Sequence, residues 1–279
     1  MPKYKKIDKR LLTVGSLLLI AGVVGLAAYQ MFAQPQTPKL PEPSLKELAS
    51  YHDVKLGNFA IANHLDSKPY TDILTSQFDF ALADNTPNWY FTGGGLRPSK
   101  DSYNFEQMDQ VVGFAEAHNM PVEAHHFVWG EQKWLPDWLK DGNYNKQELL
   151  DLLQDHITTV GQKYSGRIAT WTVVNEAFTR DQHLFDLRDW WADNIGDQSY
   201  IDQSFIWARQ ADPHAKLILN DFNNESINDT SNAMYDYLKG ALERGIPIDG
   251  IGMQMHIDAD TRQPRMKSFP IWSALPILA

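Results

Sequence analysis

Short apolar runs alternate with longer amphipathic stretches from about Ser44 to residue 257. Six of these runs have the length and composition of strands that are buried on both faces of a parallel sheet. They cover residues 55–62, 78–83, 121–128, 168–175, 216–221 and 250–254. The chain between successive runs is long enough for a helix, so the pattern predicts repeated strand–helix units.

Two helices can be placed from their capping residues and apolar faces. Asn104 is predicted to be the N-cap of the first helix, with Gln107 completing a capping box. Asn145 is predicted to cap the second helix, with Glu148 in the same relative position. The apolar faces follow a helical period: Phe105, Met108, Val111, Val112 and Ala115 in the first helix, and Leu149, Leu153, Ile157, Val160 and Tyr164 in the second.

The order of these elements predicts an α/β fold. Six strand–helix units that run in one direction form either a (β/α)8 TIM barrel or a doubly wound sheet. The barrel is favoured because no Gly-x-Gly-x-x-Gly sequence follows a predicted strand. Residues 258–279 contain three prolines and no helical stripe. We therefore expect an incomplete barrel of about six of the eight units over residues 45–257, followed by an aberrant tail at 258–279.

The first 44 residues have a different pattern. Lys and Arg fill half of positions 1–10, and residues 11–28, from Leu11 through Ala28, are uncharged and almost wholly apolar. About 20 residues cross a hydrocarbon core of about 30 Å, and a basic flank favours the cytoplasmic side. We expect a cytoplasmic tip (1–10), a single-pass transmembrane signal anchor (11–33), a Pro-rich linker (34–44) and an extracytoplasmic domain. The alternative is a cleaved signal peptide, which would leave a secreted protein.

Composition excludes several classes of function. The formal net charge is −10, and the rest of the chain is more acidic still because five basic residues lie in the first ten positions. An acidic body is unsuited to binding nucleic acid. The chain has no cysteine, which excludes disulfides, thiolate metal sites and cysteine nucleophiles.

Polar residues gather where the predicted strands end. The groups are Asp84-Asn85, His125-His126 with Trp129, Asn175-Glu176, Asn220-Asp221 with Asn223, and Gln254 with His256. In a barrel of parallel strands, the carboxyl ends of the strands form the active face. Each group alone fits a turn, a cap or a buried histidine, but five groups in the same relative position indicate a site.

Glu176 is the residue with the most telling surroundings. It follows a buried strand within the sequence Trp-Thr-Val-Val-Asn-Glu-Ala-Phe at 171–178. An apolar setting favours the protonated form of a carboxyl group, which suits a general acid. In glycoside hydrolysis, an acid of this kind protonates the departing oxygen. The amide of Asn175 can hold a neighbouring sugar hydroxyl.

These motifs resemble those of family-10 glycoside hydrolases, which are retaining endo-1,4-β-xylanases with a (β/α)8 fold. Residues 171–176 are similar to the family's Trp-Asp-Val-Val-Asn-Glu, and residues 124–129 to its Gly-His-Thr-Leu-Val-Trp. Residues 220–223 are similar to Asn-Asp-Tyr-Asn, and residues 248–256 to Ile-Asp-Gly-Ile-Gly-x-Gln-x-His. The motifs occur in the family's order between about residues 45 and 257.

The resemblance implies a role for each matching residue. Glu176 corresponds to the catalytic acid/base. The residues implied to bind substrate are Asn175, His125, Asn85, Trp129, Gln254 and His256. The implied substrate is β-1,4-xylan or a xylo-oligosaccharide, bound by a monomer without a cofactor or a metal.

Two departures concern substrate binding, and a third concerns the chemistry. Asn88 stands where the family has a sugar-binding Lys, and Gly130 stands where it has a His. A retaining mechanism also needs a nucleophilic carboxylate about 5 to 5.5 Å from the acid/base. The family supplies it from a Thr-Glu-x-Asp strand, and no such sequence follows His256. We therefore expect a truncated or frameshifted chain with no nucleophile, which is poorly folded or inactive.

Three alternatives remain from the sequence. The chain could be a non-catalytic sugar-binding protein on the cell surface, or a related (β/α)8 glycosidase that acts on another β-glycan. A metalloenzyme is the weakest alternative, because His125 and His126 lack the i,i+4 spacing of helical metal ligands.

Overall fold

A computed structural model describes residues 42–84, 95–178 and 189–256. The chain divides into two units after Pro41, and the described residues all belong to the second unit. The predicted tip (1–10), membrane segment (11–33), most of the linker (34–41) and the tail (258–279) lie outside the described residues. Within the described ranges, no helix has the length and apolar character needed to cross a bilayer.

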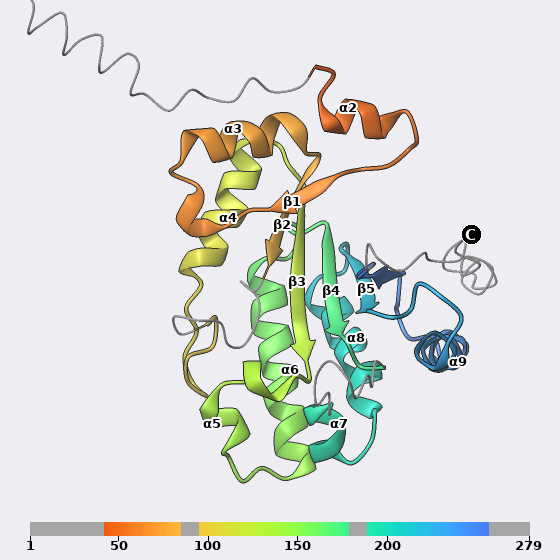
Figure 1. Cartoon of the computed structure of the whole chain (residues 1–279). Coiled ribbons are helices and arrows are strands. Elements are labelled where there is room, and N and C mark those ends of the chain that lie inside the picture. The colour runs from red at the N-terminus through yellow and green to blue at the C-terminus, as the bar shows by residue number, and fades with distance from the viewer. Residues whose placement is uncertain (1–41, 85–94, 179–188, 257–279) are drawn as a thin grey trace, which may run out of the picture. The chain divides into compact units, whose positions relative to one another are not determined.

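The centre of the fold is a sheet of six parallel strands (Figure 1). The strands are β1 (Gly57–Phe59), β2 (Phe80–Asp84), β3 (Val122–Trp129), β4 (Thr170–Asn175), β5 (Lys216–Asp221) and β6 (Gly250–Met253). Each lies in a range that the sequence predicted, give or take one residue. Their order in the sheet is their order in the chain. The predicted parallel α/β fold is confirmed, and a doubly wound sheet, whose strand order reverses, is excluded.

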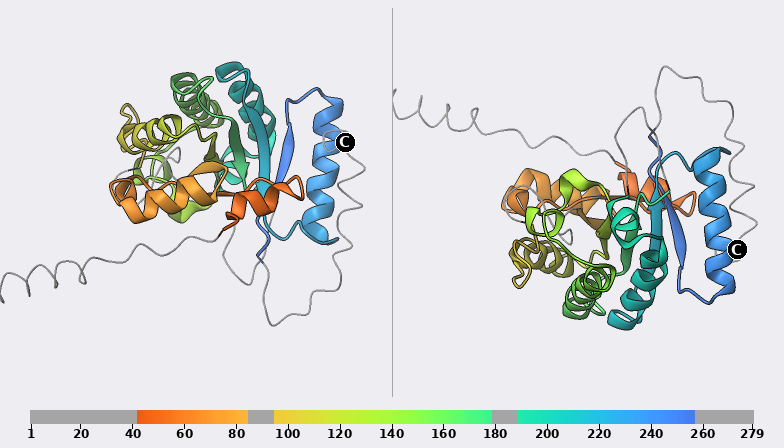
Figure 2. Two further views of the ribbon diagram at one scale, coloured as in Figure 1. Left: turned by 90° about the horizontal axis from the view of Figure 1, so that it is seen from above. Right: turned by 90° about the horizontal axis from the view of Figure 1, so that it is seen from below.

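Helices connect the strands and lie around the outer face of the curved sheet (Figure 2). They are α2 (Leu45–Ser50), α3 (Lys68–Gln77), α4 (Glu106–Ala117), α5 (Asp137–Lys140), α6 (Lys146–Lys163), α7 (Trp190–Ile195), α8 (Ser199–Ala211) and α9 (Asp229–Glu243), with 3₁₀ turns η1 (Ala62–His64) and η2 (Gln132–Trp134). This arrangement corresponds to six consecutive units of a (β/α)8 barrel. In the described part of the chain, β1 and β6 each pair on one side.

The two helices predicted from their caps differ in outcome. At α6, the Asn145 side chain accepts the Glu148 N–H at 3.1 Å, and the Glu148 carboxylate accepts the Asn145 N–H at 2.8 Å. This confirms the predicted capping box. The N-cap predicted for α4 is wrong, because the helix begins one residue later with Phe105 as its cap. Asn104 instead accepts the Glu106 N–H at 3.0 Å, an Asx-type turn that competes with a capping box.

The core lies between the sheet and the helices. The Trp171 ring stacks on Phe127 from the neighbouring strand, with 4.2 Å between ring centroids. Its indole N–H donates to the Asp212 carboxylate at 3.0 Å, so the buried polar atom is satisfied. The apolar faces predicted for α4 and α6 are buried here. This packing fixes the strands, and with them the polar residues at their carboxyl ends.

Candidate active site

Glu176 lies at the point where β4 ends. Its backbone has φ 58°, in the left-handed region, and its N–H donates to the Asn220 carbonyl of β5 at 2.8 Å. A residue with a side chain adopts this conformation at a cost of order 1 kcal/mol. The turn takes the chain out of the sheet directly after Asn175, so that the carboxylate stands at the rim instead of continuing the strand.

Two neutral N–H groups hold the Glu176 carboxylate. Trp129, at the end of β3, donates its indole N–H to Oε2 at 2.7 Å, and Gln254, after β6, donates its amide N–H to Oε1 at 2.7 Å. Because Trp129 binds one oxygen and Gln254 binds the other, the orientation of the carboxyl group is fixed. The residue is half-buried, so the group remains accessible to a ligand at the rim.

Asn175 is held through its amide oxygen. Oδ1 accepts the Asn220 side-chain N–H at 2.6 Å and is 3.4 Å from Gln254 Nε2. The residue is 3% exposed. With its oxygen fixed in this way, the amide nitrogen is the atom that can donate to a ligand hydroxyl.

His256 extends the same network. Its Nε2 is 2.8 Å from Gln254 Oε1. Since the amide nitrogen of Gln254 faces Glu176, its amide oxygen must accept, and His256 Nε2 therefore carries a proton. The structure thus brings four of the predicted residues, Asn175, Trp129, Gln254 and His256, into one hydrogen-bonded group around Glu176.

Two predicted residues stand apart from this group. Asn85 lies outside the described residues. His125 lies within β3, in register with Thr172 of β4, and its ring packs edge-on against His126 with 4.7 Å between centroids. Burial lowers the pKa of His125 to about 4, so its ring is neutral at pH 7. His125 can therefore donate one hydrogen bond and accept another, but it carries no charge to the site.

Trp134 and Asp189 were not among the residues predicted from the sequence. Trp134, in η2, stacks near the Trp129 ring with 6.4 Å between centroids and an interplanar angle of 19°. Asp189 precedes α7 and accepts the Ala192 N–H and the Tyr200 hydroxyl. Aromatic spacing after the third strand could have pointed to Trp134. An Asp directly before a helix is a local N-cap signal that could have pointed to Asp189, whereas its bond to Tyr200 depends on the tertiary fold.

The backbone at Trp129 and Gly130 is hydrogen-bonded to the residues that follow Asp189. The Trp190 N–H donates to the Gly130 carbonyl at 3.0 Å, and the Trp191 indole donates to the Trp129 carbonyl at 3.3 Å. Gly130 is required by this close approach, because a Cβ there would lie 2.4 Å from Asp189 Oδ1. Burial raises the pKa of Asp189. The backbone on either side of Trp129 is therefore tied to the start of α7.

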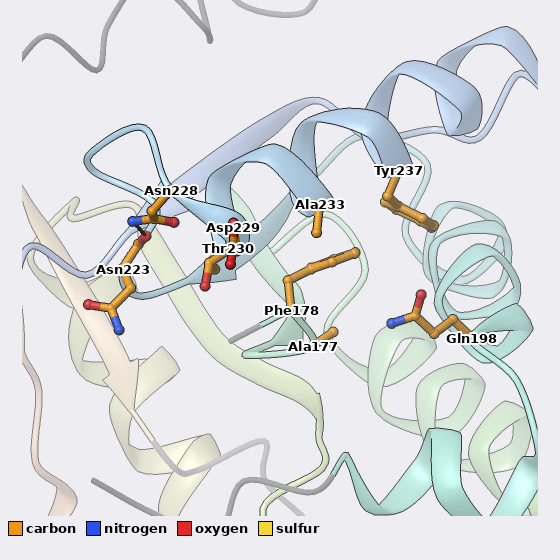
Figure 3. Close-up of a pocket in the computed structure, with 9 residues that line it drawn as sticks. All are labelled: Ala177, Phe178, Gln198, Asn223, Asn228, Asp229, Thr230, Ala233 and Tyr237. Atoms are coloured by element: carbon orange, nitrogen blue, oxygen red, sulfur yellow. Dashed lines mark hydrogen bonds between the residues drawn. The ribbon is translucent and has the colours of Figure 1, made fainter. Parts of the chain in front are cut away.

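A cavity of about 890 Å³ lies beside the loop that follows Glu176 (Figure 3). Ala177 and Phe178 line it from this loop, and Asp229, Thr230 and Ala233 line it from the first turns of α9. Figure 3 also shows Asn223 and Asn228, joined by a hydrogen bond of 2.7 Å from the Asn228 amide to the Asn223 carbonyl. The cavity therefore borders the rim that carries Glu176.

A metal site is not apparent in the described ranges, where no three His, Asp or Glu side chains gather closely enough to hold an ion. His126 is 1% exposed. Among the described residues, neither of its ring nitrogens has a hydrogen-bond partner. Burial lowers the pKa of His126 well below its usual range. This ring is therefore neutral and packed under Trp129, with 5.3 Å between centroids.

Comparison with known proteins identifies the relationship. The family model described as Glycosyl hydrolase family 10 matches residues 44–270. The chain belongs to this family. The resemblance inferred from the motifs is confirmed, and the match extends past residue 257 into the predicted aberrant tail.

Individual family members are similar over most of this chain. An endo-1,4-beta-xylanase B of Thermotoga neapolitana is 39% identical over 218 residues, covering 77% of this chain and 60% of the relative. A beta-1,4-xylanase of Dictyoglomus thermophilum is 34% identical over 235 residues, covering 84% and 63%. The crystal structure of xylanase 10B from Thermotoga petrophila RKU-1 in complex with xylobiose has a TM-score of 0.69 at 38% identity, covering 79% and 65%. The chain thus spans about three fifths of the length of these family members.

Proposed function

We propose that this chain carries the acid/base half of a site that hydrolyses internal β-1,4-xylosidic bonds. Glu176 is the proton donor to the departing glycosidic oxygen, and Asn175 holds a hydroxyl of the neighbouring sugar. The observation that carries the proposal is the pair of N–H donors, Trp129 and Gln254, that fix the Glu176 carboxylate at the rim. Membership of a family whose relatives are named xylanases supports xylan as the substrate class.

The remaining predicted residues are proposed to bind the same sugar. His256 and Gln254 lie in the Glu176 network, and Trp129 presents an aromatic face suited to the C–H surface of a sugar ring. His125 is neutral and suited to a hydroxyl, and Asn85 is assigned by the family resemblance alone.

The second carboxylate of a retaining mechanism has no candidate among the described residues near Glu176. Beyond His256, the only acidic residues of the sequence are Asp258 and Asp260. We therefore propose that residues 1–279 alone bind xylo-oligosaccharides without cleaving them. The hydrogen-bonded acid/base side of the site supports this sugar-binding role.

Calorimetry and a hydrolysis assay on the same purified chain test both statements. We expect xylotriose to bind and beechwood xylan to release no reducing sugar. Glu176→Gln keeps the shape of the group but can accept only one of the two N–H bonds, so we expect it to bind xylotriose more weakly without losing binding. Release of xylo-oligosaccharides that Glu176→Gln abolishes would show that the chain is a complete enzyme. Absence of xylotriose binding would contradict the sugar-binding role.

The backbone sugar can be settled with a panel of β-glycans. One relative, 34% identical over 215 residues, is an exoglucanase XynX of Acetivibrio thermocellus. We expect xylo-oligosaccharides to bind more tightly than cello- or manno-oligosaccharides of the same length. Equal or tighter binding of a cello-oligosaccharide would reassign the substrate to glucan.

We further propose that residues 11–33 anchor the chain in a membrane, with the domain on the extracytoplasmic side. The support is the apolar run and its basic flank. Expression of the full chain should give a membrane-bound protein whose domain is cut by protease added outside the cell. Deletion of residues 1–33 should release it, and N-terminal sequencing would reveal signal cleavage if the mature protein instead begins near residue 34.

A further inference from the structure

The segment that carries Gln254 has little support from the sheet. β6 is four residues long and, in the described chain, pairs with β5 alone. The Gln254 N–H reaches the Asp221 carbonyl at 3.1 Å, which is the last backbone bond toward β5. Met255 then turns with φ 53°, a left-handed conformation that is unfavourable for a residue with a side chain.

The loop after β5 supplies the missing support. The Asn224 side chain is fully buried and donates an N–H to the Gly252 carbonyl at 2.9 Å. Glu225, the next residue, accepts the Met255 N–H through Oε1 at 2.7 Å. These two side chains therefore hold β6 just before and just after Gln254.

Of these two hydrogen bonds, the one from the Met255 N–H to Glu225 has the larger effect on the position of the Gln254 amide. Gln254 bridges Glu176 and His256 through its amide, so a small rotation of the Met255 turn displaces both contacts. The Glu225 oxygen gives the Met255 N–H an acceptor in this turn, which favours the turn. This bond offsets part of the cost of the left-handed conformation of Met255.

We propose that Glu225 is a positioning residue, whose bond to the Met255 N–H holds the Gln254 amide against Glu176. The proposal rests on the role assigned to Glu176 above, although the contact itself is independent of that role. Glu225 acts through Gln254 and does not touch the reacting atoms.

Two substitutions separate the acceptor function of Glu225 from its charge. Glu225→Ala removes the acceptor, whereas Glu225→Gln removes the charge and keeps an amide oxygen that can accept the Met255 N–H. Glu243→Ala is the matched control, because it removes an exposed carboxylate from the end of α9.

The first readout is the side-chain amide of Gln254, followed by ¹H–¹⁵N spectroscopy and assigned by its loss in Gln254→Glu. We expect its exchange with water to speed up at least tenfold in Glu225→Ala and to change less than threefold in Glu225→Gln and Glu243→Ala. Unchanged exchange in Glu225→Ala would overturn the proposal. Equal acceleration in Glu225→Gln would also overturn it, because charge rather than the acceptor would then be decisive.

The second readout is xylotriose affinity. We expect Glu225→Ala to bind at least fivefold more weakly and Glu225→Gln to bind within twofold of the unsubstituted chain. Equal weakening in both variants, with the Gln254 signal intact, would make Glu225 a direct sugar ligand and overturn the positioning role. If the unsubstituted chain does not bind xylotriose, the proposed function fails, while the Gln254 exchange still decides the role of Glu225.

Discussion

The two hydrogen bonds to the Glu176 carboxylate have the same length, but their donors are held in place by different parts of the structure. Trp129 and Gln254 each donate to the carboxylate at 2.7 Å. Trp129 is backed by the buried rings of Trp190 and Trp191 and by the Asp189 contacts at α7. Gln254 directly follows the last strand of the described sheet and is held by polar side chains from one loop.

Equal hydrogen-bond lengths at a site therefore do not imply equal sensitivity to substitution of the supporting residues. Residues behind Trp129 contribute to the core, so replacing them costs folding free energy. Behind Gln254, Asn224 is buried but Glu225 is half-exposed, so replacing Glu225 changes the site more than the fold.

Asp189→Ala should destabilise the protein by about 3 kcal/mol. The substitution removes the N-cap of α7 and leaves the hydroxyl of buried Tyr200 without its acceptor. Urea unfolding followed by circular dichroism measures the change. Asp193→Ala, at an exposed position of the same helix, should stay within about 0.5 kcal/mol. Similar losses in both variants would mean that the Trp129 side has no special support.

Gly130→Ala should cost about 2 kcal/mol. The added Cβ would lie 3.1 Å from both Asp189 Cα and Trp190 N, which are backbone atoms that cannot move independently. Gly113→Ala is the control, since nothing lies within 4 Å of its Cβ position and the residue is in the middle of α4. That control should be stabilising, by up to about 1 kcal/mol. A neutral Gly130→Ala would show that the contact between Gly130 and Asp189 can relax.

The histidines beneath Trp129 should make stability depend on pH. Burial lowers the pKa of His125 to about 4 and that of His126 in the same direction. As pH falls below about 6.5, the unfolded chain takes up protons that the folded protein does not, so the free energy of unfolding falls until about pH 4.

His126→Phe tests this effect by removing one of the two groups. Between pH 7.5 and 5 the variant should lose less unfolding free energy than the unsubstituted chain, by about 2 kcal/mol. Urea titrations at both pH values measure it. Replacement of exposed His52 by Gln should leave the pH dependence as it was. If the free energy of unfolding of His126→Phe falls with pH as much as that of the unsubstituted chain, the His126 ring is not buried in solution.

Gln254→Ala should have the smallest effect on stability, below about 0.5 kcal/mol, because the residue is half-buried. It should nevertheless weaken xylotriose binding severalfold, since Glu176 Oε1 and His256 both lose their partner. Gln107→Ala, on the exposed face of α4, should change neither quantity. A large loss of stability in Gln254→Ala would remove the contrast between the two sides.

Much of the fold was predictable because it depends on periodicity and burial. The six strands follow from apolar runs, and the start of α6 follows from the reciprocal bonds between Asn145 and Glu148. The start of α4 was not predictable in the same way, because Asn104 can cap a helix or close an Asx turn with similar local bonds. Only the packing of Phe105 and its neighbours decides between them.

The residues of the site could be predicted from the sequence, but the hydrogen bonds between them could not. Parallel strands place their carboxyl ends together, which is why Asn175, Trp129 and Gln254 could be assigned to one rim. The pairing of Trp129 with one oxygen and Gln254 with the other depends on the left-handed turn at Glu176. The bonds from Tyr200 to Asp189 and from Met255 to Glu225 could not be predicted because each joins residues distant in the sequence.

The strictly sequential strand order has a consequence for how the site is made. Every strand pairs with the strand that precedes it in the chain, so the sheet can grow from the amino end as the polypeptide leaves the ribosome. Trp129 and Glu176 are then in place while Gln254 is still being synthesised. The last donor to the carboxylate is thus added by the final described strand, and a nascent chain stalled before β6 would hold Glu176 by one side alone.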